Sequence, residues 1–189
     1  MWNIQGVVPP VAIGEEGHSH ERSPYPISIL DFIQKFALST ERIEILIGFL
    51  EYRKAIYLSG IETGFQWVNG SFVENIESID ERAPNDIDVV TFSNLYQTIP
   101  DYPNWAKNNS SFLNNPIAKL QYKVDSYWVD MDIGFNEYSI ERCTYWYSMW
   151  SHQRDTNIWK GFFVISLSPN DDNEAINYLS GLNVEPNHA

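Results

Sequence analysis

The chain has 189 residues, a net charge of −13 and a hydrophobic fraction of 43%. That is enough to fill one core without disulfides or metal, and an acidic surface disfavours an extended nucleic-acid groove or an anionic membrane as a partner. The single cysteine, Cys143, cannot form an internal disulfide, and we expect a buried structural thiol. No apolar run approaches the ~18 residues of a membrane span, and no signal peptide is recognisable. We therefore expect a cytoplasmic protein.

The sequence predicts a single domain over residues 1–189, in which residues 1–27 form an extended N-terminal arm. Four of the ten prolines lie in this arm, and prolines favour extended backbone. His18 and His20 occupy a glycine-rich loop there. They are candidate metal ligands, but no Cys or third His lies nearby, so we favour solvated histidines.

A pair of helices is predicted over residues 28–58. Ser28 caps the first helix, with Asp31 in a variant of the capping box. The second runs from about Thr40 to Leu58, with Ser39 or Thr40 as its cap. Its apolar face is expected at Ile43, Leu46, Ile47 and Leu50, and its solvated face at Arg42, Arg53 and Lys54.

Alternating and apolar runs predict strands over residues 65–69, 86–92, 122–132 and 159–167. Residues 74–81 form a polar surface excursion, and residues 96–115 are loop-rich with one short helix around Trp105. An aromatic helix is predicted over residues 137–150, its rings serving mainly as core, and a short helix over 171–181 precedes a fraying tail. The pattern predicts an α+β fold, a mixed sheet of four to five strands flanked by helices.

Two carboxylates begin the second strand. Asp86 and Asp88 are two residues apart, so strand alternation places both side chains on one face. Like charges raise each other's pKa, which makes this pair costly unless a cation compensates it. Mg²⁺ takes oxygen ligands and bridges to substrate phosphates, and a third carboxylate would complete a two-metal site. A turn-and-cap pair after Pro84 is the plainer alternative.

Gly70 and Ser71 directly follow the first strand of the sheet. A glycine there lets the backbone turn sharply and approach a ligand. The amides that follow, with the Ser71 hydroxyl, are suited to phosphate oxygens. Each part is weak alone, but a phosphate turn and paired carboxylates on adjacent elements together describe nucleotidyl transfer.

These residues carry a resemblance. Gly70-Ser71 followed by Asp86-Ile87-Asp88 resembles the signature of the polymerase-β-like nucleotidyltransferase superfamily. More narrowly, the chain is similar to an uncharacterised group of small bacterial proteins with that domain, and the similarity runs through residues 8–10, 67–73, 84–90 and 122–129, with Arg154 and Lys160. The resemblance implies that Gly70 and Ser71 contact nucleotide phosphates, and that Asp86, Asp88 and Asp125 bind Mg²⁺ or Mn²⁺.

Three points of this assignment stay open. Strand alternation alone leaves Asp130 and Asp132 as alternatives to Asp125, and we follow the resemblance in choosing Asp125. Arg154 and Lys160 are candidates for holding the triphosphate, or else ordinary cations near an aromatic helix. Fifteen positions separate Ser71 from Asp86, more than the pattern usually shows, so residues 74–82 are an insertion that affects which acceptor fits.

We thus expect a metal-dependent nucleotidyltransferase that moves a nucleoside monophosphate from an NTP to a hydroxyl on a protein, an RNA end or a small molecule. By analogy with small members of the superfamily, the setting is a bacterial toxin–antitoxin or phage-defence system. The alternative is a catalytically silent nucleotide-binding or protein-interaction module. A metal-dependent hydrolase is a third, weaker reading, since carboxylate clusters also activate water.

Overall fold

One mixed five-stranded sheet organises the protein. The structure, a computed structural model, describes residues 1–95 and 99–182. The strand order is β1-β5-β2-β3-β4; the strands are β1 (Tyr25–Pro26), β2 (Phe65–Asn69), β3 (Ile87–Ser93), β4 (Val124–Asp130) and β5 (Phe163–Ser166). Strand β3 runs parallel to β4, while β2 is antiparallel to both of its neighbours. The predicted α+β fold with a mixed sheet is confirmed.

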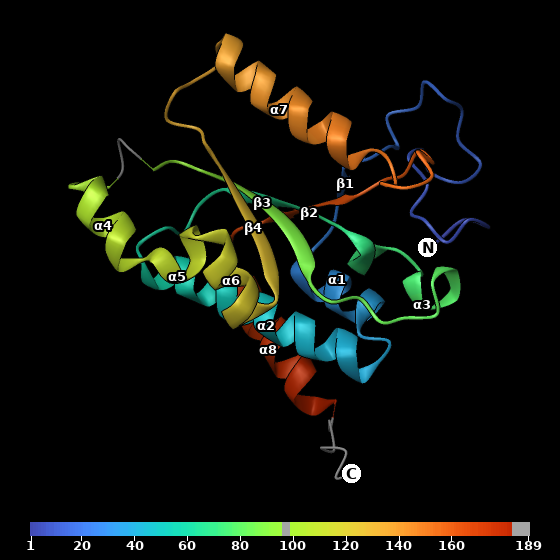
Figure 1. The fold of residues 1–189 in the computed structure, drawn as a ribbon, viewed down its shortest axis with the longest axis horizontal. Coiled ribbons are helices and arrows are strands. Elements are labelled where there is room, and N and C mark those ends of the chain that lie inside the picture. The colour runs from blue at the N-terminus through green and yellow to red at the C-terminus, as the bar shows by residue number, and fades with distance from the viewer. Residues whose placement is uncertain (96–98, 183–189) are drawn as a thin grey trace.

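Helices cover both faces of the sheet (Figure 1). Helix α7 (Glu137–Trp150) lies on one side, and the other side is covered by α1 (Ile29–Phe36), α2 (Thr40–Leu58), α4 (Tyr102–Asn108), α5 (Ser110–Leu113), α6 (Asn115–Tyr122) and α8 (Pro169–Gly181). Strand β3 is buried on both faces: Val89 packs into the cluster on the α2 side, and Val90 and Phe92 pack against α7. A continuous apolar run is expected of such a strand.

The capping residues set the first two helices where the sequence predicts them. The Ser28 hydroxyl accepts from the amide of Asp31 at 3.0 Å, and the Ser39 hydroxyl accepts from the amide of Arg42 at 3.3 Å. Each bond satisfies an amide that the first helical turn leaves without a backbone partner.

Helix α6 is missing from the sequence prediction. Asn114 caps it, accepting from the amide of Ile117 at 3.3 Å, and Pro116 lies in its first turn. Proline is well tolerated at this position, because its missing amide hydrogen would have no helical partner there. Pro116 therefore begins a helix instead of extending the loop. Of the expected loop-rich stretch, residues 96–98 lie outside the described residues, as does the tail from residue 183.

The predicted solvated face of α2 is right for Lys54, which is exposed, but wrong for its two arginines. Arg42 and Arg53 are fully buried, while Ile47, expected on the apolar face, is 45% exposed. Each guanidinium forms a bidentate pair, Arg42 with Glu77 at 2.6 and 2.8 Å and Arg53 with Asp172 at 2.7 Å. These carboxylates come from distant segments, which explains how charged side chains are accommodated in a core.

The polar stretch after Ser71 is also more buried than expected. Glu74 and Ile76 are 4% and 3% exposed, and the segment folds as a short 3-10 turn (Ser71–Val73) followed by α3 (Ile76–Ile79). Within the ranges that the structure describes, none of the helices has the length and apolar character needed to cross a membrane.

Candidate functional site

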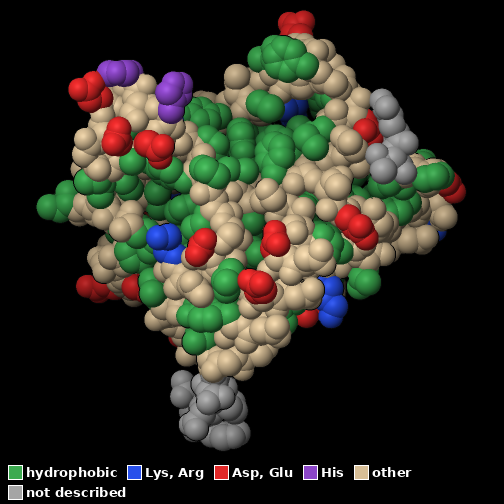
Figure 2. Space-filling view, turned by 180° about the vertical axis from the view of Figure 1, so that it is seen from behind, with side chains coloured by type: hydrophobic (Ala, Val, Ile, Leu, Met, Phe, Trp, Pro, Cys, Tyr) green, Lys and Arg blue, Asp and Glu red, His purple; other side chains and the backbone are tan. Residues whose placement is uncertain are grey.

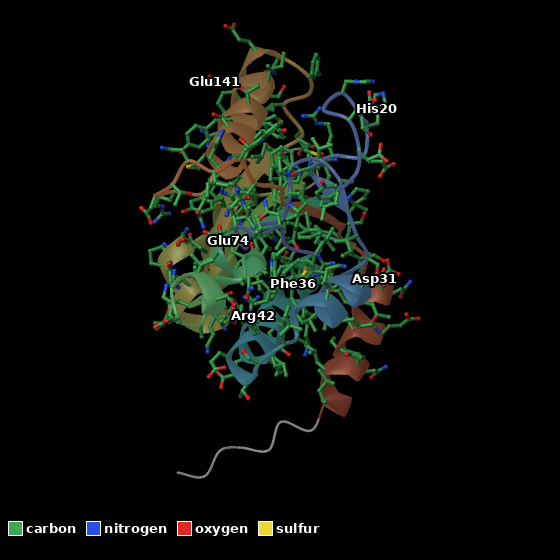
Figure 3. The ribbon with its side chains drawn as sticks, turned by 90° about the vertical axis from the view of Figure 1, so that its right-hand side faces the viewer. His20, Asp31, Phe36, Arg42, Glu74 and Glu141 are labelled. Carbon is green, nitrogen blue, oxygen red and sulfur yellow. The ribbon has the colours of Figure 1, made fainter. Side chains whose placement is uncertain are left out.

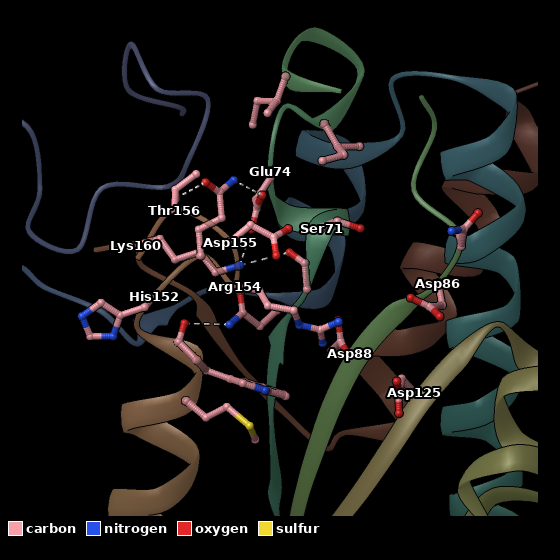
Figure 4. A pocket seen from close by; sticks show the side chains of 18 of the residues that line it. Ser71, Glu74, Asp86, Asp88, Asp125, His152, Arg154, Asp155, Thr156 and Lys160 are labelled. Atoms are coloured by element: carbon pink, nitrogen blue, oxygen red, sulfur yellow. Dashed lines mark hydrogen bonds and ion pairs between the residues drawn. The ribbon is translucent and has the colours of Figure 1, made fainter. Parts of the chain in front are cut away.

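A cavity of about 810 Å³ opens at one end of β2, β3 and β4. It brings together every predicted site residue: Gly70, Ser71, Asp86, Asp88, Asp125 and Lys160. Figure 4 shows the three aspartates on one side of this cavity and Lys160 with Glu74 on the other.

The strand register decides which acids are neighbours. In the parallel pairing of β3 with β4, Asp88 is the direct partner of Asp125, and both side chains are partly buried. Asp130 is the partner of Ser93 at the opposite end of β4. Its Oδ1 accepts from the amides of Leu95 and Asp132, at 3.1 and 3.0 Å. The geometry thus places Asp125, and not Asp130, beside Asp88; its role as a ligand stays a prediction.

The turn after β2 is closely packed against this acid pair. Gly70 has φ +86°, and a Cβ built on it would lie 1.8 Å from Oδ2 of Asp88. A side chain is therefore excluded for two reasons, backbone strain and overlap with the carboxylate. The absence of a Cβ lets the turn approach the acids; the predicted approach of this turn to a phosphate stays a prediction.

Repulsion and burial leave Asp88 short of compensating charge. Burial, and to a smaller extent the negative charges of Asp125 and Asp86, raise the pKa of Asp88 to about 7, against smaller opposing effects from Lys160 and Lys119. A carboxylic acid that stays partly protonated near neutral pH marks a place where an additional cation would stabilise the ionised form.

Lys119 of α6 lines this cavity beside the acids, and the sequence reasoning missed it. Its Nζ lies 2.6 Å from Oδ2 of Asp86 and 3.2 Å from Oδ2 of Asp125. The hydrogen bond to Asp86 is the main cause that raises the pKa of Lys119. The available signal was the Asn-Pro cap at residues 114–116: a helix from there places Asn115 and Lys119 one turn apart on one face.

Asn115 and Lys119 together hold Asp125. Asn115 Nδ2 donates to Oδ1 of Asp125, while Lys119 donates to Oδ2. Burial alone would raise the pKa of Asp125, but hydrogen bonds from Asn115, Tyr127 and Lys119 outweigh it and lower that pKa. Both oxygens of this acid thus have partners from α6.

The carboxylates suit a hard divalent cation by their chemistry, though not by their present arrangement. Over residues 1–95 and 99–182, no group of three or more His, Cys, Asp or Glu side chains is placed to hold a metal ion. The Lys119 ammonium group instead contacts Asp86 and Asp125. Three carboxylates at the adjacent ends of β3 and β4, one of them with a raised pKa, provide oxygen donors and uncompensated charge that suit Mg²⁺.

Lys160 is buried and paired with Glu74, at 5% and 4% exposure. The pair forms a direct hydrogen bond, and Gln153 Nε2 donates to the second Glu74 oxygen at 2.8 Å. Lys160 Nζ also lies 3.5 Å from the carbonyl oxygen of Gly70. Lys160 therefore supports the turn from behind, and a contact between it and a phosphate stays a prediction.

Aromatic side chains of α7 form another wall of the cavity. Trp146 and Trp150 are buried, as predicted for core, but Tyr138 and Tyr145 are 54% and 51% exposed, because α7 contacts the sheet along only one side. Cys143 is half-buried, less than expected, and burial raises the pKa of its thiol.

Figure 2 shows apolar side chains gathered in a hollow on the face turned away from the view of Figure 1.

The N-terminal histidines take no part in the cavity. His18 lies 3.4 Å from Glu16 and both side chains are more than 80% exposed. Figure 3 shows His20 at the tip of the arm, away from Glu74 and Arg42. The expectation of solvated loop histidines agrees with these positions.

Comparison with protein families gives one match. The model described as "Family of unknown function (DUF6932)" matches residues 1–166. Neither a search of curated proteins nor one of solved structures gives a match.

Proposed function

This chain belongs to the DUF6932 family, and we propose that it is a metal-dependent nucleotidyltransferase. It would move a nucleoside monophosphate from an NTP to a hydroxyl acceptor on a protein, an RNA end or a small molecule. The observation that carries the proposal is the register pairing of Asp88 with Asp125, with the Gly70 turn packed against Asp88. The turn that would bind phosphate and the three acids thereby line one cavity.

Each group would have a distinct role. Gly70 and Ser71 would position the triphosphate, and Asp86, Asp88 and Asp125 would hold Mg²⁺ or Mn²⁺. The ion supplies charge neutralisation of the triphosphate and of the attacking oxygen. The acceptor oxygen forms a bond to the α-phosphorus, the bond to pyrophosphate breaks, and the hydroxyl proton passes to solvent. Such a transfer is catalysed mainly by positioning the reactants and by electrostatic stabilisation of the transition state.

We also propose a cellular compartment, a class of acceptor and a biological system for this activity. A single half-buried cysteine and an NTP substrate suit a reducing cytoplasm. The net charge of −13 favours a protein or small-molecule acceptor, or a short RNA end, over a long nucleic acid. A toxin–antitoxin or phage-defence role rests on the resemblance of the sequence signature alone.

Label transfer tests the proposal. The purified protein is incubated with each α-³²P-labelled NTP, Mg²⁺ or Mn²⁺ and a bacterial lysate as acceptor, beside Asp86→Ala/Asp88→Ala. The matched control is Glu51→Ala/Glu174→Ala, which removes two exposed carboxylates outside the cavity lining. We expect transfer by the wild type and the control, and none by the aspartate variant. Nucleotide binding without transfer would favour the silent module, and phosphate release alone would favour a hydrolase.

A further inference from the structure

We propose that Lys119 is the resident cation of the carboxylate site, and that a divalent ion binds Asp86 and Asp125 only by displacing its ammonium group. This inference rests on the proposed function, because it concerns the same metal site. It adds a property that the function does not require: competition between a side chain and the metal.

The contacts of Lys119 place its charge between two of the three acids. Nζ lies 2.6 Å from Asp86 Oδ2 and 3.2 Å from Asp125 Oδ2. The two carboxylates have side-chain exposures of only 15% and 18%. An ammonium ion and a divalent ion on the same oxygen atoms would lie only about 4 Å apart, so their charges repel each other and favour release of the ammonium group.

Lys119 is also able to leave. Its side chain is 49% exposed, so the ammonium group lies at the solvent side of the acids and loses little burial on moving out. Lysine has a flexible four-carbon stem and a strongly hydrated head, and both properties ease the exchange of a carboxylate for water.

The backbone of α6 stays in place during such an exchange. A Cβ on Gly48 would lie 2.2 Å from the carbonyl oxygen of Tyr122, so α2 and α6 are in direct backbone contact at this glycine. Asn115, one turn before Lys119, donates to the other oxygen of Asp125. Displacement is therefore a side-chain movement that frees Oδ2 of Asp125 while Oδ1 keeps its partner.

Competition of this kind has two consequences. Without metal, Lys119 reduces the repulsion among Asp86, Asp88 and Asp125, and so stabilises the folded protein. With metal, the same charge must be moved, which weakens ion binding relative to three carboxylates alone. The site would then be filled only when the cation is plentiful or arrives with a triphosphate.

The test compares Lys119→Gln with Lys123→Gln. Lys123, at the end of the same helix, pairs with the exposed Glu44 at 2.7 Å, so the control removes the same charge and one ion pair away from the acids. Mn²⁺ affinity is measured by calorimetry without nucleotide, and Tm is measured in chelator. We expect Lys119→Gln to bind Mn²⁺ about tenfold more tightly and to melt at a lower temperature than the wild type without metal. Lys123→Gln should leave the Mn²⁺ affinity unchanged.

Lys119→Arg separates charge from shape and should keep an affinity near that of the wild type. Wild-type binding of Mn²⁺ with equal or weaker binding by Lys119→Gln would overturn the inference and leave the proposed function intact. Absence of Mn²⁺ binding in the wild type, in Lys119→Gln and in Asp86→Ala/Asp88→Ala alike would overturn both.

Discussion

An oxygen of Asp88 occupies the space that a Cβ atom on Gly70 would need: the two would be 1.8 Å apart. The turn at Gly70 and the acid Asp88 are thus fitted to each other, although 18 positions separate them in the chain. The contact depends on a residue without a side chain at a backbone angle of φ +86°.

Replacing Gly70 by alanine is expected to destabilise the protein and move Asp88. The positive φ alone costs about 1 kcal/mol in an L-residue, and overlap with the carboxylate adds to it. Gly14→Ala is the matched control: Gly14 has φ +92° but nothing within 4 Å of its Cβ position. Urea unfolding measures the free energy of unfolding of both variants. An equal loss of stability in the two variants would contradict the close packing of Gly70 with Asp88.

Asp88→Asn is expected to stabilise the metal-free protein at alkaline pH. Burial, together with the charges of Asp125 and Asp86, raises the folded-state pKa of Asp88 to about 7, whereas the unfolded value is about 3.9. Between these values the folded state binds the proton and the unfolded state does not, so wild-type stability falls as pH rises through this window. Above about pH 7 both states are ionised and the loss is complete.

We therefore expect the stability difference between Asp88→Asn and wild type to be small near pH 4 and to approach about 4 kcal/mol at pH 8. Urea unfolding in chelator across this range measures it, with the exposed Glu51→Gln as control. A difference that does not change with pH would show that Asp88 titrates normally.

Arg53→Met is expected to cost about 3 kcal/mol of unfolding free energy, because it leaves Asp172 charged and buried without its partner. Arg53 also donates to Gln66 at 2.7 Å, so the loss extends to β2. Lys54→Met, at the adjacent and exposed position, is the control. Chemical denaturation measures the unfolding free energy of both variants. If Arg53→Met lost no more of it than Lys54→Met, a structural role for the Arg53–Asp172 pair would be refuted.

Arg154→Gln is expected to weaken NTP binding without changing Tm. Arg154 is exposed and lines the same cavity as Ser71, so its guanidinium is available to a phosphate. Loss of one charged hydrogen bond should lower affinity about tenfold. Titration with a non-hydrolysable NTP measures it, and Arg142→Gln, outside this cavity, is the control. Unchanged affinity would remove Arg154 from the phosphate site.

The local sequence was sufficient to predict those helices and strands that depend on local interactions. Serine caps and helical periodicity predict α2 at its observed bounds, and alternation predicts β2. Helix α6 was also predictable in principle, since its Asn-Pro cap is a local signal. The pairing of Gly-Ser with Asp-x-Asp was sufficient to select Gly70, Ser71, Asp86 and Asp88, which meet in the cavity.

Only the tertiary structure determined which charged side chains lie next to each other. Arg42 and Arg53 follow the pattern of a solvated helix face, yet are buried because Glu77 and Asp172 reach them from segments 35 and 119 positions away. Strand alternation left Asp125, Asp130 and Asp132 open, and only the register with β3 placed Asp125 beside Asp88. The same holds for Lys119 between the acids. Pairing between distant segments depends on how the chain packs, and local sequence periodicity therefore does not predict it.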